Sequence, residues 1–84
     1  MEESYLVTGW VYVFGEKKEL LPISCEFFDK EIRCSQDFEE VFEKGRKVIA
    51  KKFSEQHPNR SFSIDGIALW KKARIGGHWV NLEK

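Results

Sequence analysis

Apolar residues recur at the spacing of one helical face between Ser35 and Gln56. The members of this face are Phe38, Val41, Phe42, Val48, Ile49 and Phe53. This period of 3.6 residues predicts one long amphipathic helix over the whole stretch. Gly45 falls on the same face, and glycine inside a helix costs about 1 kcal/mol relative to alanine. Its place on the buried side therefore indicates close approach of another backbone.

Local signals predict both ends of this helix. Ser35 is the expected N-cap, whose hydroxyl accepts a hydrogen bond from a free backbone N–H of the first turn. The dipeptide His57-Pro58 ends the helix, because a proline turns the preceding residue away from helical angles. Acidic residues gather in the first half and basic residues in the second, which suits the helix dipole. Glu40 and Lys44 are one expected i,i+4 pair.

Two stretches before the helix, Tyr5–Phe14 and Leu20–Phe28, alternate like strands. Along the first stretch the odd positions after Tyr5 are aliphatic with Gly9, whereas most even positions are aromatic. The polar segment 15–19 contains a glycine and joins the two strands as a hairpin turn. Pro22 cannot donate to a strand ladder, so the second strand is expected to be an edge strand near Pro22 or to bulge there.

A third strand is expected from Ser61 to Lys72, and Asp65-Gly66 interrupts its alternation. This dipeptide forms either a bulge in one strand or a tight turn between two short strands. We favour the bulge, because a strand of about four residues pairs poorly on its own. The bulge would place three apolar residues on the helix side, Ile64, Ile67 and Leu69. A turn at Gly76-Gly77 and a short strand from His78 to Leu82 follow.

These elements predict an α+β fold, a β-β-α-β-β two-layer sandwich in which one long helix packs across one face of an antiparallel sheet. Residues 1–84 are expected to form a single domain. The valine-rich side of the first hairpin is expected beneath the helix, with Gly9 and Gly45 at the point of closest approach. A register slipped by one residue would exchange the two faces of the sheet.

The composition, with 42% apolar and 33% charged residues, is that of a folded domain. We expect a cytoplasmic protein, because no membrane-length apolar run occurs and Met1–Ser4 lacks the layout of a secretion signal. Cys25 and Cys34 should then stay reduced, Cys25 as a small core residue. We expect no metal and no cofactor, since the spacings of the cysteines and of His57 and His78 do not suit a metal site.

The zero net charge hides a split along the chain. Residues 1–43 carry eleven acidic and four basic residues, whereas residues 44–84 carry three acidic and ten basic residues. This asymmetry stays visible at the surface only if the fold keeps the two halves apart. In that case it favours a partner with a charged patch, or a contact between copies of the chain.

One helix covers only one side of a four-stranded sheet, so the other side faces water, a partner or another copy. On the expected register this side carries five rings, Trp10, Tyr12, Phe14, Phe28 and Trp70. They are the candidate partner-binding residues, because contiguous apolar patches mark interaction sites and Trp and Tyr are enriched at hot spots. Two alternatives stay open: loops and termini cover the rings as a second small core, or the rings only stabilise the sheet as cross-strand pairs.

Single-stranded nucleic acid is the alternative partner. Its candidate contacts are Arg60, Trp70, Lys71, Lys72 and Arg74. Sheet aromatics flanked by basic side chains stack bases while the cations hold phosphates. The zero net charge and the carboxylates of the first hairpin argue against this function.

No set of side chains has the spacing of a catalytic site, which needs a nucleophile, a base in reach and an orienting group. Glycine motifs of nucleotide-binding loops are also missing from the sequence. The sequence therefore predicts a small cytosolic, non-enzymatic interaction or regulatory module that binds a protein partner or itself through the aromatic face. Accessory and inhibitory regulators, including those that phages encode, are often chains of this size.

Overall fold

The computed structural model describes residues 2–15 and 17–82, which form one sheet and one helix. The elements in chain order are β1 (Glu2–Val13), β2 (Glu19–Lys30), α1 (Ser35–Gln56), β3 (Phe62–Lys72) and β4 (Trp79–Asn81). The predicted bounds of the helix are confirmed. The first hairpin is longer than predicted, because β1 begins before Tyr5 and β2 continues beyond Phe28.

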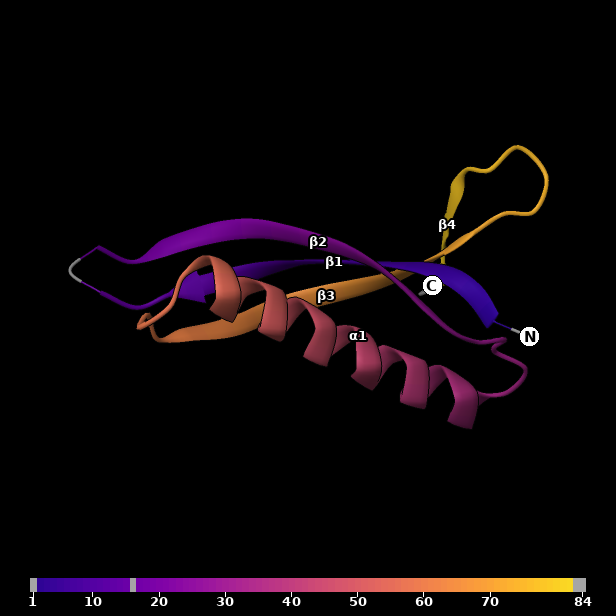
Figure 1. The fold of residues 1–84 in the computed structure, drawn as a ribbon, viewed down its shortest axis with the longest axis horizontal. Helices are drawn as coiled ribbons and strands as arrows, with labels where there is room; N and C mark the ends of the chain where they lie inside the picture. The colour runs from indigo at the N-terminus through magenta and orange to yellow at the C-terminus, as the bar shows by residue number, and fades with distance from the viewer. Residues whose placement is uncertain (1, 16, 83–84) are drawn as a thin grey trace.

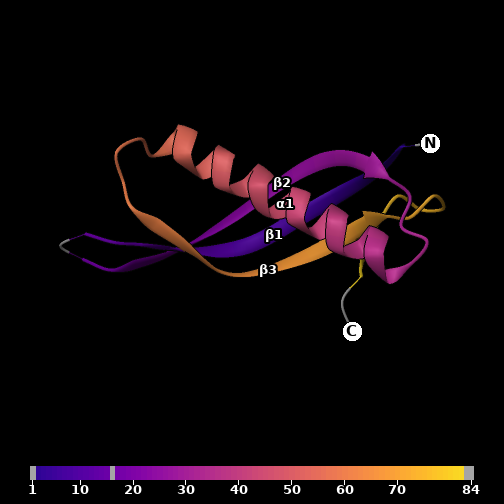
Figure 2. The ribbon, with the colours of Figure 1, turned by 90° about the horizontal axis from the view of Figure 1, so that it is seen from below.

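The strands form one antiparallel sheet in the order β2-β1-β3-β4, and α1 lies across one side of it (Figures 1 and 2). β1 pairs along its length with β2 on one side and with β3 on the other. Because β2 and β3 both run antiparallel to β1, they are parallel to each other and α1 is the crossover between them. The α+β class and the antiparallel sheet with one helix are confirmed. Within the described ranges, α1 is too polar to cross a bilayer as a helix.

The core lies between α1 and the odd-numbered side of β1. Its buried residues are Tyr5, Val7, Val11, Val13, Ile23, Phe27, Val41, Ile49, Phe53 and Leu69. Full burial of such a side chain contributes about 1.5–3 kcal/mol, so this side holds most of the stability. The expectation that the valine-rich side of the first hairpin lies beneath the helix is confirmed.

Gly45 brings α1 close to β1, but the residue it meets is Val7. A Cβ added at Gly45 would lie 3.3 Å from the Cβ of Val7. A Cβ added at Gly9 would lie 2.6 Å from the carbonyl oxygen of Gly66 in β3 and 3.5 Å from Ile49. The prediction that Gly9 and Gly45 together mark the point of closest approach is therefore wrong, because Gly45 lies against Val7 and Gly9 makes room chiefly for the neighbouring strand β3.

β3 carries a bulge at Asp65. Trp10 lies opposite Gly66 and Val11 lies opposite Ile64, so the pairing with β1 skips Asp65. The bulge predicted at Asp65-Gly66 is confirmed, and the alternative of a turn between two strands is wrong. The shift of one residue keeps the apolar side chains on the helix side. These side chains are Ile64, Ile67 and Leu69.

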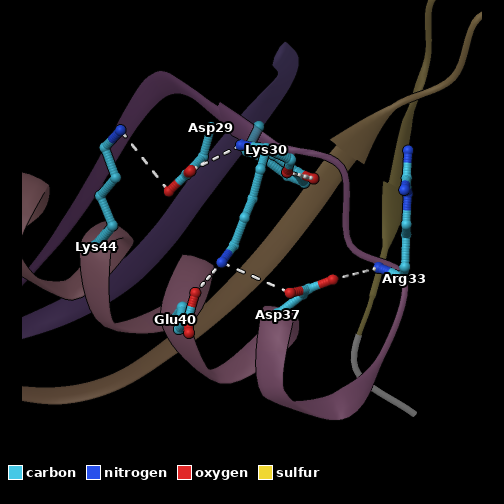
Figure 3. Close-up of polar contacts among 7 residues, drawn as sticks. Asp29, Lys30, Arg33, Asp37, Glu40 and Lys44 are labelled. Carbon is cyan, nitrogen blue, oxygen red and sulfur yellow. Dashed lines mark hydrogen bonds and ion pairs between the residues drawn. The ribbon is translucent and has the colours of Figure 1, made fainter. Parts of the chain in front are cut away.

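Charged side chains connect the start of α1 to the end of β2 (Figure 3). Lys30 pairs with Glu40, and its Nζ lies 3.5 Å from Oδ1 of Asp37. Lys44 reaches back to Asp29, with 3.7 Å between Nζ and Oδ2. The predicted pair of Glu40 with Lys44 is wrong, because each side chain finds its partner on β2 instead.

The N-cap of α1 is Cys34, so the prediction of Ser35 is wrong. Cys34 makes no capping hydrogen bond with its side chain. Asp37 Oδ2 instead accepts a hydrogen bond of 3.1 Å from the backbone N–H of Arg33 (Figure 3). This bond holds the pKa of Asp37 below its ordinary value, and the carboxylate lies at the positive end of the helix dipole. At the other end, His57 is the C-cap and the predicted stop is confirmed.

The outer side of the edge strand β2 is shielded. Lys44 and Lys52 of α1 donate hydrogen bonds from Nζ to the carbonyl oxygens of Phe28, at 2.9 Å, and Ser24, at 2.6 Å. Alternate residues of an antiparallel strand point their backbone groups the same way, so Pro22 also faces outward, where it needs no N–H. The edge-strand prediction at Pro22 is confirmed, and another strand cannot readily add here.

The acidic first half and the basic second half of the chain meet inside the fold. Glu3 of β1 pairs with Arg74, at 2.8 Å between Oε1 and Nη2, and lies 3.8 Å from Nζ of Lys71. The ion pair between Lys44 of α1 and Asp29 of β2 joins the halves in the same way. The fold therefore does not keep the halves apart, and the condition for a surface charge split is not met.

Candidate docking surface on the open face of the sheet

The side of the sheet opposite α1, called the open face below, consists of even-numbered positions of β1 and β2 and their partners on β3. Its cross-strand rows are Glu26–Leu6–Trp70, Ser24–Thr8–Ala68, Pro22–Trp10–Gly66 and Leu20–Tyr12–Ser63. Phe28 stands opposite Ser4 at one end of these rows. Phe14 follows β1 at the other end, where its ring centroid lies 5.5 Å from that of Tyr12. The structure thus brings all five predicted rings to one side of the sheet.

The five rings are exposed to different degrees. Trp10 and Phe28 keep 50% and 61% of their surface exposed, and Phe14 is similarly exposed. Tyr12 and Trp70 are half-buried. The alternative in which other segments cover the whole face is therefore wrong for three of the five rings. Their role in binding a partner stays a prediction.

Trp70 is held on the open face by a hydrogen bond. Its Nε1 donates to Oγ1 of Thr8 at 2.9 Å, across the pair β1–β3. Such a bond contributes about 1 kcal/mol to stability. It also satisfies the polar end of the indole within the sheet, so the outward-facing part of the ring is apolar.

Small side chains leave a hollow of about 620 Å³ in the middle of the open face. Its lining from this face consists of Thr8, Trp10, Pro22, Ser24, Gly66 and Ala68. The bulge contributes to the hollow, because it places Gly66, without a side chain, in the row of Trp10. A depression beside exposed rings suits an inserted side chain from a partner. The sequence does not predict this hollow, because the floor of the hollow forms only when three strands pair in register.

The basic residues predicted to bind nucleic acid do not gather on the open face. Lys71 and Arg74 both pair with Glu3 on the odd-numbered side of the sheet. The hydrogen bond from Arg74 lowers the pKa of Glu3, and the same bond raises the pKa of Arg74. Strand alternation leaves Lys72 on the same side as Trp70.

Arg60 lies at the opposite end of the sheet from Trp70. Its Nη2 is 3.5 Å from the place that a Cβ on Gly15 would take, beside the β1–β2 connection. Trp70 pairs with Leu6, towards the start of β1. The structure therefore brings Trp70 and Lys72 together and separates Arg60 from both.

The hairpin of β3 and β4 projects on the side of the sheet away from α1 (Figure 1). Gly76 and Gly77 turn its tip with φ values of 84° and 65°, which glycine adopts without strain. Ile75 beside them keeps 88% of its surface exposed. The exposure of Ile75 could not be predicted from the sequence, because the pattern within a loop does not show which side of the sheet the loop lies on. Leu20 is a further exposed residue of the open face that was not among the predicted site residues, although its even-numbered position opposite Tyr12 could have indicated it.

The two cysteines and the buried Tyr5 lie outside the open face. Within residues 2–15 and 17–82, no three His, Cys, Asp or Glu side chains are placed to hold a metal ion. Cys25 and Cys34 are both free, and Cys25 packs against the core as predicted. The buried Tyr5 donates its hydroxyl to the carbonyl oxygen of Lys30 at 2.7 Å. The hydrogen bond from this hydroxyl joins β1 to the end of β2. Burial raises the pKa of Tyr5.

Comparisons with family models, with curated proteins and with solved structures gave no significant match to this chain.

Proposed function

We propose that this chain is a non-enzymatic binding module that docks a protein partner on the open face. The exposure of Trp10 and Phe28 carries this proposal. Aromatic side chains present about 150–250 Å² each, and full burial of a large apolar side chain is worth about 1.5–3 kcal/mol. The core on the other side of the sheet does not use these rings, so a partner that covers them gains this free energy.

The layout of the open face supports a protein as that partner. Exposed rings surround a hollow, and small polar groups from Thr8 and Ser24 lie among them. Protein interfaces combine aromatic anchors with pockets in this way. Both cysteines are free, which suits the reducing cytoplasm. We therefore propose that the chain is an accessory or inhibitory regulator that acts in the cytoplasm.

Single-stranded nucleic acid is the less supported partner. Stacking proteins line the backbone path with several cations. Here Lys71 and Arg74 are engaged in ion pairs, and Arg60 lies near the far end. Of the basic residues predicted to contact phosphates, Lys72 then remains beside Trp70.

Site-specific photo-crosslinking tests the proposed protein docking. A photo-crosslinking residue replaces Phe28 or Trp10 on the open face, and Lys51 on the exposed side of α1 serves as the control position. In cells that encode the chain, the two open-face positions should give the same protein adduct, identified by mass spectrometry. Adducts of equal yield from Lys51, or no protein adduct from either face position, would contradict the proposal.

A salt titration tests the nucleic-acid alternative. Binding of a single-stranded oligonucleotide is followed by tryptophan fluorescence at about 20 mM and about 200 mM salt. Phosphate contacts would make the affinity fall steeply between these conditions. No binding at the lower salt concentration removes the alternative, whereas salt-dependent binding would replace the protein partner with nucleic acid.

A further inference from the structure

We propose that the partner on the open face is a second copy of this chain, with Ile75 of each copy entering the hollow of the other. This inference rests on the proposed docking function of the open face and names its occupant. It predicts a two-fold dimer in which two sheets stack face to face.

A projection and a matching depression lie on the same side of the molecule. The hairpin that carries Ile75 rises away from α1 (Figure 1), and the hollow lies in the open face, which is also opposite α1. A two-fold contact needs a self-complementary surface, in which residue i meets residue j and j meets i. Ile75 is an apolar side chain with 88% of its surface exposed, and the hollow supplies the apolar surroundings that it lacks.

The edges of the sheet are poor sites for a second copy. On β2, Pro22 and the hydrogen bonds from Lys44 and Lys52 shield the outer side. On β3, β4 pairs only with residues 70–72, and the bulge at Asp65 interrupts the strand that precedes them. Prolines, lysines, bulges and charged residues at an edge oppose strand addition. Two copies are therefore expected to meet through their faces.

Charge and area both permit face-to-face contact. The cross-strand rows of the open face contain Glu26 as their one charged residue, and Lys72 follows Trp70. The opposite charges of Glu26 and Lys72 limit repulsion between copies.

At about 3.3 Å per residue and about 4.8 Å between strands, three strands of about twelve residues present roughly 570 Å². Two such faces with their hairpins reach the roughly 1,000 Å² of a specific interface. An area near this limit predicts a weak dimer, with a dissociation constant in the micromolar range.

Sedimentation equilibrium from about 1 µM to about 500 µM tests the dimer, because this range spans micromolar affinity. The mass of the full chain should rise from that of a monomer towards twice that value. Ile75→Ser removes the projecting side chain, and Ala68→Leu fills the hollow. Each should weaken association at least tenfold, an effect of about 1.4 kcal/mol. Circular dichroism checks that each variant is folded.

Val80→Ser is the matched control. Val80 is also an exposed aliphatic residue of the β3–β4 hairpin, but it pairs with Lys71 at an odd-numbered, helix-side position. This change should leave the dissociation constant unaltered. An equal effect of Val80→Ser, or a dimer insensitive to Ile75→Ser and Ala68→Leu, would overturn the inference.

A chain that stays monomeric at the highest concentration would also overturn it. That result differs from failure of the proposed function, because Phe28 would then still crosslink to a different protein. Absence of both a dimer and an open-face adduct would overturn both proposals.

Discussion

Trp70 Nε1 and Thr8 Oγ1, 62 positions apart in the chain, form a hydrogen bond of 2.9 Å across β1 and β3. The bond belongs to the open face and satisfies the one polar atom of the indole. The part of the Trp70 ring that faces outward is therefore apolar. The bond also fixes the indole of Trp70 across β1 and β3.

Thr8→Val should lower the free energy of unfolding by about 1 kcal/mol, because the half-buried indole N–H loses its acceptor while the shape of the side chain is kept. Urea denaturation followed by tryptophan fluorescence measures the change. Thr8→Ser keeps the hydroxyl and should restore most of the loss. Equal stability of Thr8→Val and the unmodified chain would argue that the bond does not persist in solution.

Trp10→Ser should change the free energy of unfolding of the monomer by less than about 1 kcal/mol, since surface substitutions away from buried contacts have small effects. Leu69→Ala on the opposite side is the contrast. Leu69 is fully buried, so its truncation should cost about 2–5 kcal/mol. Chemical denaturation at low protein concentration compares the two. A cost of several kcal/mol for Trp10→Ser would place this indole in a core.

Gly45→Leu should destabilise the fold by about 1–3 kcal/mol or more, because the new side chain must displace Val7 or push α1 from the sheet. A Cβ alone would already lie 3.3 Å from Val7. Lys47→Leu introduces the same side chain at an exposed position of α1 and should have little effect. Similar melting temperatures for the two variants would contradict the close approach of helix and sheet.

Glu3→Gln should lower the melting temperature at neutral pH. The folded-state pKa of Glu3 lies below its ordinary value of 4.5, chiefly through the hydrogen bond from Arg74. The ionised carboxylate therefore stabilises the fold above about pH 4.5, and this contribution is lost as the pH falls through the lowered pKa. Melting curves across acidic and neutral pH should show the two chains converge in acid. In an Arg74→Met background the effect of Glu3→Gln should shrink, and a difference independent of pH would exclude this mechanism.

The strands, the helix and the two faces of the sheet could be predicted because their signals are local. Alternation along β1 separated aliphatic from aromatic positions, and the period of α1 marked its buried side. Even the bulge at Asp65-Gly66 could be predicted, because a strand of about four residues pairs poorly on its own. Each of these inferences used residues within one element.

The errors concern contacts between distant elements. The residue that Gly45 meets depends on how α1 crosses β1, which no pattern within either element specifies. The charge split would stay visible at the surface only if the fold kept the two halves apart, but antiparallel pairing brings Glu3 of the first half beside Arg74 of the second. The hollow and the projection of Ile75 likewise depend on the assembled sheet. For the candidate site, the side of the sheet that carries the rings could therefore be predicted, but the hollow between the rings could not.

The most direct test of an open, docking-competent face is the solvent accessibility of Trp10. Trp70→Phe and Trp79→Phe leave Trp10 as the only indole, and acrylamide quenching is measured at submicromolar and at high protein concentration. The structure predicts strong quenching in the dilute sample, because half of the Trp10 surface is exposed, and protection when a second copy docks. Weak quenching that does not change with concentration would mean that the chain itself covers this ring, which would contradict the docking surface.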